Sequence, residues 1–269
     1  MRVGIDAGSK YIKAVVCSET HAMAANAGCA GSLFFEHHGN PAREISRILE
    51  AHSPHDVNGV IRSIADADTV GVTGLFAEAA VAAIAGKGAA VVELVDEIAA
   101  VIDAARFHGC NCRYIVNVGG GSIKYVELDS GGMFSLYREN SLCAAGTGSF
   151  LDEQMRRMDF SYESANDIPL QTDPPDIATR CAVFAKSDLI HRQQEGFSRA
   201  EMWSGLCRGV ASTMLHSVFR GSLPDAPVLF CGGLFLNHQV RYWVQRMAPN
   251  AVFRDDGHFF PAIGAALAA

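Results

Sequence analysis

Short apolar runs broken by glycine-containing turns dominate the beginning of the chain. Arg2–Ile5 has the pattern of a buried strand, Asp6–Ser9 that of a tight turn and Tyr11–Cys17 that of a returning strand. Unbroken apolar runs of this length between turn residues are typical of strands buried on both faces. The chain is therefore predicted to open with a β-hairpin whose turn carries Asp6 and Gly8.

Helical and strand patterns alternate after this hairpin, which indicates an α/β protein. In the segment 96–107, for example, Ile98, Val101 and Ile102 share one face of a helix. Strands are predicted over 69–73, 89–93 and 228–231. Helices are predicted over 41–52, 77–85, 96–107, 150–158, 182–191, 199–219, 236–247 and 263–268.

The opening unit returns in the middle of the chain. Tyr114–Val118 is predicted as a strand, Gly119–Ser122 as a turn and Ile123–Leu128 as the return strand. This duplication indicates two similar halves, each offering a loop to one ligand. It is the layout of the actin-like, sugar-kinase and Hsp70-type ATPases, so we expect a two-lobed, actin-like α/β fold with duplicated ribonuclease-H-like lobes. The expected lobes are residues 1–112 with 248–269, and residues 113–247.

Composition limits the class of protein. The chain has 269 residues, of which 49% are hydrophobic and 19% charged, as in a globular protein with a well-formed core. A net charge of -7 argues against a nucleic-acid partner. No apolar run reaches the roughly 18 residues of a membrane span, and the first predicted strand follows Met1 too closely for a signal peptide. We expect a cytoplasmic protein.

The first turn has the residues of a phosphate-binding loop. Gly8 lets backbone amides approach a phosphate, Ser9 adds a hydroxyl contact, and Asp6 is suited to hold Mg²⁺ through water. Lys13 completes this candidate set. The alternative is a plain hairpin turn.

The second turn offers a matching set of amides to the same triphosphate. Its repetition of the first turn favours phosphate binding over the alternative, a glycine-rich hairpin in an ordinary enzyme. Asn117 occupies the position of Asp6 and is the second candidate catalytic residue. The other candidate residues here are Gly119, Gly120, Gly121, Ser122 and Lys124.

A third glycine site follows the apolar run Val228–Cys231. Gly232 and Gly233 would let a flat purine lie against the backbone, with Asn237 capping the next helix or touching the nucleoside. The alternative is a strand–helix junction that needs small residues. Three glycine sites in this order form a specific combination for ATP or ADP.

Two cysteines lie downstream of the first two glycine turns, and each begins a short apolar segment. Cys143 begins Cys-Ala-Ala-Gly-Thr-Gly-Ser-Phe, and Cys181 begins Cys-Ala-Val-Phe-Ala-Lys-Ser-Asp. A helix N-terminus favours negative charge and hence a thiolate, which is a ligand for an iron–sulfur cluster. Two cysteines make only half of a four-cysteine site. A second subunit would have to supply the rest.

The remaining cysteines have simpler interpretations. Cys110 and Cys112 are predicted to be two loop thiols without a shared ligand, and no Cys-x-x-Cys pair points to zinc. Four others are predicted to act as small hydrophobic residues in the core: Cys17, Cys29, Cys207 and Cys231.

These motifs resemble the ATP-dependent activators of 2-hydroxyacyl-CoA dehydratases, which are grouped with the ATPase subunits of benzoyl-CoA reductase. The resemblance covers nearly the whole chain and is most specific at the two cysteine motifs, of which the first also supplies Gly146 and Gly148 to the cofactor site. It implies that Cys143 and Cys181 of each of two subunits hold one 4Fe-4S cluster, in a homodimer or a heterodimer with a related subunit. It further implies ATP- and Mg²⁺-dependent delivery of an electron from ferredoxin or flavodoxin to an acyl-CoA dehydratase or reductase.

The chain departs from that family at the second turn. Family members usually carry Asp-x-Gly-Gly-Gln-Asp-Ser-Lys there, whereas this chain has Asn117 for the first Asp and Gly121 for the Gln, and keeps Lys124. The replaced groups would help to bind magnesium and to orient the attacking water. The expected result is a slow ATPase, or a specialised subunit that pairs with a more typical one.

Two other functions fit part of the pattern. The opening Gly-Ile-Asp-Ala-Gly also resembles the type II pantothenate kinases, and Asp96 or Glu97 would then serve as the base for an acceptor hydroxyl. That interpretation leaves Cys143 and Cys181 unexplained. An inactive nucleotide-binding scaffold would follow from the altered second turn.

Overall fold

The computed structural model describes residues 1–17, 31–50, 60–86, 91–140 and 145–269. The chain forms two compact units. Unit 1 consists of residues 1–111 and 259–269, and unit 2 of residues 112–258. The chain thus enters unit 2 once and returns once, so that the C-terminal helix completes the unit that the N-terminal strand begins.

Unit 1 is built on a five-stranded mixed sheet with the order β3-β2-β1-β4-β5. The hairpin β1–β2 and strand β3 are antiparallel, whereas β4 and β5 run parallel to β1. The strands are β1 (Arg2–Ala7), β2 (Tyr11–Cys17), β3 (Gly31–Glu36), β4 (Thr69–Thr73) and β5 (Val91–Leu94).

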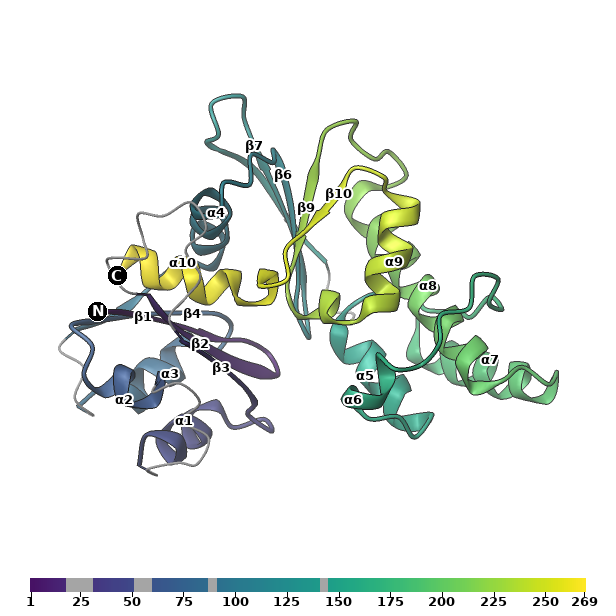
Figure 1. Cartoon of the computed structure of the whole chain (residues 1–269), viewed down its shortest axis with the longest axis horizontal. Coiled ribbons are helices and arrows are strands. Elements are labelled where there is room, and N and C mark those ends of the chain that lie inside the picture. Colours follow the sequence, from purple (N-terminus) through teal and green to yellow (C-terminus); the bar gives the residue numbers. More distant parts are fainter. Residues whose placement is uncertain (18–30, 51–59, 87–90, 141–144) are drawn as a thin grey trace. The chain divides into compact units, whose positions relative to one another are not determined.

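Helices cover both faces of this sheet (Figure 1). The C-terminal helix α10 lies directly on the central strands, because Gly4 of β1 and Gly71 of β4 leave room for its carbonyls at Ala262 and Ala265. Gly264 of α10 in turn lies against the backbone of α4. The helices of unit 1 are α1 (Pro41–Glu50), α2 (Val60–Ala65), α3 (Ala77–Ile84), α4 (Glu97–Phe107) and α10 (Phe260–Ala268).

Unit 2 repeats the same topology. Its sheet has the order β10-β9-β6-β7-β8, again with two antiparallel neighbours on one side of the first strand and two parallel ones on the other. The order of strands therefore confirms the duplicated halves. The strands are β6 (Tyr114–Val118), β7 (Ile123–Leu128), β8 (Phe134–Glu139), β9 (Val228–Cys231) and β10 (Ala251–Phe253).

A helical layer packs on the unit 2 sheet and encloses the larger hydrophobic core. The longest helix, α8, begins with a capping box in which Ser198 and Glu201 satisfy each other's backbone amides. Its buried face includes Trp203, Leu206 and Met214. The helical segments are α5 (Gly148–Arg157), α6 (Tyr162–Ala165), α7 (Ala182–Gln194), α8 (Arg199–Phe219), η2 (Gly233–Leu236), α9 (His238–Met247) and η3 (Gly257–Phe259).

The structure differs from the sequence-based lobes in one segment. Residues 248–258 were expected in the N-terminal lobe, but they belong to unit 2 because β10 pairs with β9. The first crossing lies between Asn111 and Cys112, one residue before the expected boundary. Among the described residues, no helix is both long and apolar enough to cross a membrane.

Candidate functional site

The first loop connects β1 to β2 and places a charged pair at its base. The amide of Gly8 donates to the carbonyl of Tyr11 at 3.0 Å, which closes the turn. Asp6 and Lys13 face each other in register, and the Lys13 Nζ lies 2.8 Å from the Asp6 carboxylate. Both side chains are buried. Lys13 therefore compensates the charge of the carboxylate that was predicted to hold magnesium.

Gly74, directly after β4, forms the other wall of the Asp6 site. Its φ is +96°, and a Cβ added there would lie 2.5 Å from the Asp6 carboxylate. Only glycine fits this backbone conformation and this space. Thr73 precedes it, in register with Asp6 and fully buried. The end of a parallel strand thus meets the hairpin that was predicted to bind phosphate.

His37 forms a hydrogen bond to the backbone of the first loop, a role that the sequence did not indicate. His37 is buried, whereas its neighbour His38 is exposed. His37 Nδ1 accepts a hydrogen bond from the Gly39 amide at 3.1 Å, so Nε2 carries the proton and donates to the Gly8 carbonyl at 3.1 Å. The imidazole fixes the carbonyl of the glycine that was predicted to approach phosphate.

The second loop reproduces this geometry in unit 2. The Gly119 amide donates to the Ser122 carbonyl at 3.0 Å, and Asn117 lies opposite Lys124 in the register of β6 and β7. Gly232 follows β9 with a φ of +101°, and a Cβ there would lie 2.7 Å from the Asn117 amide oxygen. Asn117 and Gly232 correspond to Asp6 and Gly74.

The charge differs between the two equivalent positions. In unit 1 a carboxylate pairs with a lysine, whereas in unit 2 the Asn117 oxygen accepts a hydrogen bond from the buried Cys231 thiol at 3.8 Å. An uncharged amide cannot supply the second carboxylate that the family pattern places here. The departure seen in the sequence is therefore a loss of negative charge at the base of the second loop.

The start of α5 supports the second loop. The amides of Gly148 and Ser149 donate to the carbonyls of Gly119 and Gly120 at 3.0 and 2.9 Å. Gly146 has a φ of +79°, which suits glycine. The structure thus brings Gly148, predicted as a cofactor residue, to the loop predicted to bind phosphate, whereas Gly146 lies against Ile123 and Met214.

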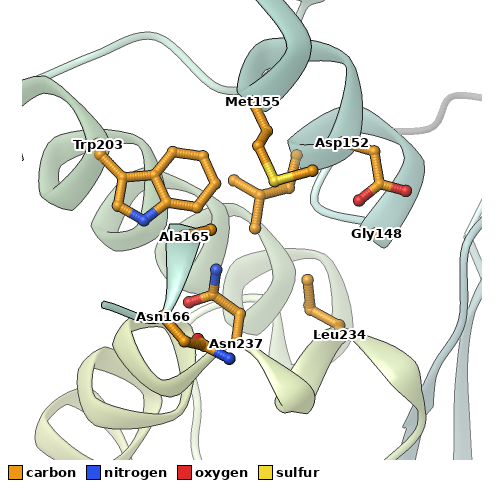
Figure 2. Close-up of a pocket in the computed structure, with 9 residues that line it drawn as sticks. Gly148, Asp152, Met155, Ala165, Asn166, Trp203, Leu234 and Asn237 are labelled. Atoms are coloured by element: carbon orange, nitrogen blue, oxygen red, sulfur yellow. The ribbon is translucent and has the colours of Figure 1, made fainter. Parts of the chain in front are cut away.

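A small pocket lies between α5 and the Gly233–Asn237 turn (Figure 2). Its cavity is about 10 Å³, close to the space of one water molecule. Asn237 caps α9 by accepting from the Val240 amide at 3.0 Å, the first of its two predicted roles. Sequence analysis missed three polar or aromatic side chains around it: Asp152, Asn166 and Trp203.

Helical spacing could have found Asp152. It lies four residues after Gly148, so both face the same side of α5. The Asp152 side chain is buried at one side of the pocket. Trp203 of α8 lies at the opposite side (Figure 2). No signal in the sequence placed Trp203 there, because α8 reaches the pocket only through the packing of helices.

Cys181 is the N-cap residue of α7, as predicted, with a half-buried free thiol. The first turn of α7 carries no acidic residue, and its side chains Val183 and Phe184 are 69% and 65% exposed. Cys143 lies outside the described residues. Among those described, no three His, Cys, Asp or Glu side chains converge as a metal site.

The core cysteines agree with the prediction where the structure describes them. Cys17, Cys207 and Cys231 are buried, whereas Cys29 lies outside the described residues. Burial raises the pKa of the Cys207 thiol well above its ordinary value, although a hydrogen bond to Asn237 opposes this shift. Cys207 therefore stays protonated and is unsuited to metal binding.

The candidate kinase base Asp96 has a structural role. It is the N-cap of α4, and its carboxylate accepts from the Ala99 amide at 2.8 Å. An N-cap aspartate satisfies an otherwise unpaired helix amide. This accounts for Asp96 without catalysis.

Comparison with known proteins places the chain. Residues 3–269 match the BadF/BadG/BcrA/BcrD ATPase family. The chain belongs to this family. The resemblance inferred from the cysteine motifs and phosphate turns is thereby confirmed.

Relatives within the family differ in how much they share with this member. The chain is 27% identical to the (R)-2-hydroxyglutaryl-CoA dehydratase activating ATPase of Acidaminococcus fermentans over 242 residues, covering 89% of the chain and 85% of that protein. It is 31% identical to the uncharacterized protein YjiL of Escherichia coli over 166 residues, 61% of the chain. That match spans 64% of YjiL, less than two thirds of its length.

Solved structures share the fold. The activator of the 2-hydroxyisocaproyl-CoA dehydratase from Clostridium difficile with bound ADPNP has a TM-score of 0.80 and 24% identity, covering 100% of this chain and 93% of its own. A ROK family glucokinase from Streptomyces griseus has a TM-score of 0.55 at 13% identity, with coverages of 100% and 98%. The predicted actin-like, sugar-kinase type of fold is confirmed.

Proposed function

We propose that this family member is an ATP-hydrolysing activator that transfers an electron to an acyl-CoA dehydratase or reductase. In this proposal Cys143 and Cys181 of each of two subunits hold one 4Fe-4S cluster. The two subunits are identical or related, and ferredoxin or flavodoxin supplies the electron. Membership of an ATPase family and the names of dehydratase activators among its relatives support the proposal.

The position of Cys181 carries the cluster part of the proposal. Its thiol stands at the N-terminus of a 13-residue helix, where the helix dipole stabilises a thiolate and an anionic cluster. Val183, Phe184 and Ile190 expose large apolar surfaces on the same helix. Apolar side chains gathered on a surface mark an interaction site, and a second subunit would cover them.

The nucleotide part rests on the paired loops. Backbone amides of the Gly8 and Gly119–Ser122 loops would bind phosphate groups of ATP, and the Asp6 carboxylate would hold Mg²⁺ through water. Lys13 holds the Asp6 carboxylate in place, since the ion pair is buried and its atoms are 2.8 Å apart. The turn at Gly232 and Gly233 would take the adenosine, and the polar side chains of the adjoining pocket are Asp152, Asn166 and Asn237.

Mechanistically, this chain's residues would separate two tasks. The loop amides would bind the triphosphate and Asp6 would hold the Mg²⁺ that neutralises it, while Cys181 would help to hold the cluster, which supplies one-electron transfer. Asn117 cannot ionise, so it would not assist magnesium. We therefore expect slow hydrolysis by the isolated protein.

Iron analysis of anaerobically purified protein tests the proposal. Wild type should contain about two iron atoms per chain with equal acid-labile sulfide, as one 4Fe-4S cluster shared by two chains requires. Cys181→Ser should lose this iron. Cys110→Ser is the matched control, because Cys110 is also a half-buried cysteine but lies outside both motifs, and this variant should keep the cluster.

Two results would contradict the proposal. Full iron content in the Cys181→Ser variant would show that Cys181 is not a ligand of the cluster. Absence of adenine-nucleotide binding to folded wild type, measured by calorimetry with Mg²⁺, would refute the ATPase part.

A further inference from the structure

A second cavity in unit 2 lies at the carboxyl ends of β9 and β10. Its volume is about 190 Å³, far larger than the space of a single water molecule but below the roughly 300–1,000 Å³ of pockets for drug-sized ligands. It therefore suits a small ion or group better than a whole nucleotide. Its wall includes backbone at Gly232 and Gly257, which are joined by a hydrogen bond of 3.0 Å.

Basic side chains outnumber acidic ones around this cavity. Four of the lining side chains are basic, and one is acidic. The basic ones are His238, Arg241, Arg254 and His258, and the acidic one is Asp255. Such convergence in a protein with a net charge of -7 is not explained by overall composition.

The acidic neighbour is weakly held. The Arg241 guanidinium contacts Asp255 at 2.9 Å, but the Asp255 side chain is 95% exposed. Exposed ion pairs of this kind contribute little, typically below about 1 kcal/mol. Arg254 Nε donates to the Asp256 carboxylate at 3.4 Å, a long hydrogen bond for a charged pair. Because Asp255 is almost fully exposed, an anion that replaces it at Arg241 leaves no buried charge unpaired.

Aromatic packing holds Arg241 in place. Its guanidinium lies 5.0 Å from the centre of the Phe253 ring, within the range of a cation–π contact. Phe253 in turn packs against Phe230 and Phe235, with ring centres 5.6 and 5.3 Å apart. A guanidinium fixed on a rigid aromatic support loses less entropy when it binds an oxyanion.

The cavity is distinct from the pocket beside α5. The turn from Gly233 to Asn237 separates the two, because Leu234 and Asn237 line the small pocket while Phe235 and Leu236 line this cavity. Neither of the loops proposed to bind phosphate lines it. Gly232 of the proposed adenosine turn contributes only backbone to the wall, so the nucleotide proposal does not account for the arginines.

We propose that this cavity binds a tetrahedral oxyanion, inorganic phosphate or the phosphate group of a small metabolite, with Arg241 and Arg254 as its main ligands. Guanidinium groups bind phosphate through paired N–H donors, which gives both charge and geometry. This oxyanion site is additional to the two loops proposed to bind the phosphates of ATP. Its occupant is therefore not the phosphate released from ATP while that phosphate is still bound at those loops.

Equilibrium dialysis with radiolabelled inorganic phosphate tests this site. Full-length protein is first saturated with Mg²⁺ and a non-hydrolysable ATP analogue, so that the proposed nucleotide positions are filled. Ionic strength is kept constant with sodium chloride, because screening alone weakens exposed charges. Wild type should bind phosphate saturably. Arg241→Gln and Arg254→Gln should each weaken binding by about tenfold or more.

Two further variants make the outcome decisive. Arg246→Gln removes the same charge from an exposed position on α9 that does not line the cavity, and it should bind phosphate like wild type. Asp255→Asn removes the competing carboxylate and should tighten binding; its near-complete exposure makes misfolding no concern. Circular dichroism confirms that the arginine variants are folded.

The proposal is overturned by three results. The first is an absence of saturable phosphate binding to wild type, and the second is an equal loss in Arg246→Gln. The third is unchanged affinity in Asp255→Asn together with unchanged affinity in the lining-arginine variants. The comparisons among the variants test the phosphate site whether or not the ATP analogue binds. Failure of the nucleotide proposal is therefore not mistaken for failure of the phosphate site.

Discussion

Two equivalent residues carry the main chemical difference between the units. Asp6 and Asn117 are the next-to-last residues of β1 and β6. Each lies opposite a lysine, and each is packed against a glycine with positive φ. The replacement changes an oxygen to a nitrogen and removes one negative charge. Because the surrounding backbone is alike in both units, the consequence is electrostatic and not a change of shape.

Restoring the charged group should speed hydrolysis. In Asn117→Asp combined with Gly121→Gln, the new carboxylate would face Lys124 as Asp6 faces Lys13, and the glutamine would orient water. Groups of this kind contribute about 10²–10⁴-fold, so we expect anaerobic phosphate release to rise measurably above wild type. The single variants separate the two contributions. An unchanged rate in the double variant would show that another residue performs this task.

At the scale of elements, the helices were predicted more reliably than the edges of the sheets. Segment 199–219 was predicted with its observed bounds, because a capping box begins it and its apolar face is regular. The three strands that sequence analysis missed, β3, β8 and β10, all lie at sheet edges. Edge strands bury less and alternate less clearly; every residue of β8 but Leu136 is exposed.

The C-terminal helix depends on close backbone contact. A Cβ at Gly264 would overlap the carbonyl group of Ala100 in α4. Alanine is favoured over glycine in helices by about 1 kcal/mol, but overpacking typically costs about 1–3 kcal/mol. Because the obstacle is backbone, which cannot move as a flexible side chain does, we expect Gly264→Ala to lower the midpoint of urea unfolding.

A control on the same helix separates packing from propensity. Ala268→Gly alters helix propensity at an exposed position near the C-terminus, so it should lower the midpoint less. Gly264→Ala protein that is as stable as wild type, or more so, would show that α10 can shift away from α4 at little cost.

At the scale of the whole molecule, the proposed cluster site would require two subunits. In that proposal two cysteines from one chain fill half of a 4Fe-4S site, and the helix that begins at Cys181 exposes Phe184. Burying a phenylalanine contributes roughly 1.5–3 kcal/mol, which corresponds to about 10- to 100-fold in a dissociation constant.

We therefore expect Phe184→Asp to weaken the dimer by about that factor or more, measured by sedimentation of anaerobic, iron-loaded protein. Phe134→Asp is the matched control, because Phe134 on β8 is exposed to a similar degree in the same unit. It should leave the dimer intact. A dimer that persists in Phe184→Asp, or dissociates only in Phe134→Asp, would place the interface elsewhere.

The sequence by itself determined the repeated hairpins, the glycine turns and the cysteine at the start of α7. Each of these follows from local rules: alternation of apolar runs, the backbone freedom of glycine and the preference for charge at a helix N-terminus. The family followed from the spacing of these motifs, since no long-range contact was needed to recognise them.

Tertiary structure alone decided which distant residues support these motifs. His37 reaches the Gly8 carbonyl, Trp203 reaches the pocket beside α5, and Arg241 and Arg254 meet around one cavity. Residues 248–258 belong to unit 2 because the three-residue strand β10 pairs with β9. Such placements depend on packing between elements far apart in the chain, for which the periodicity of a single segment holds no information.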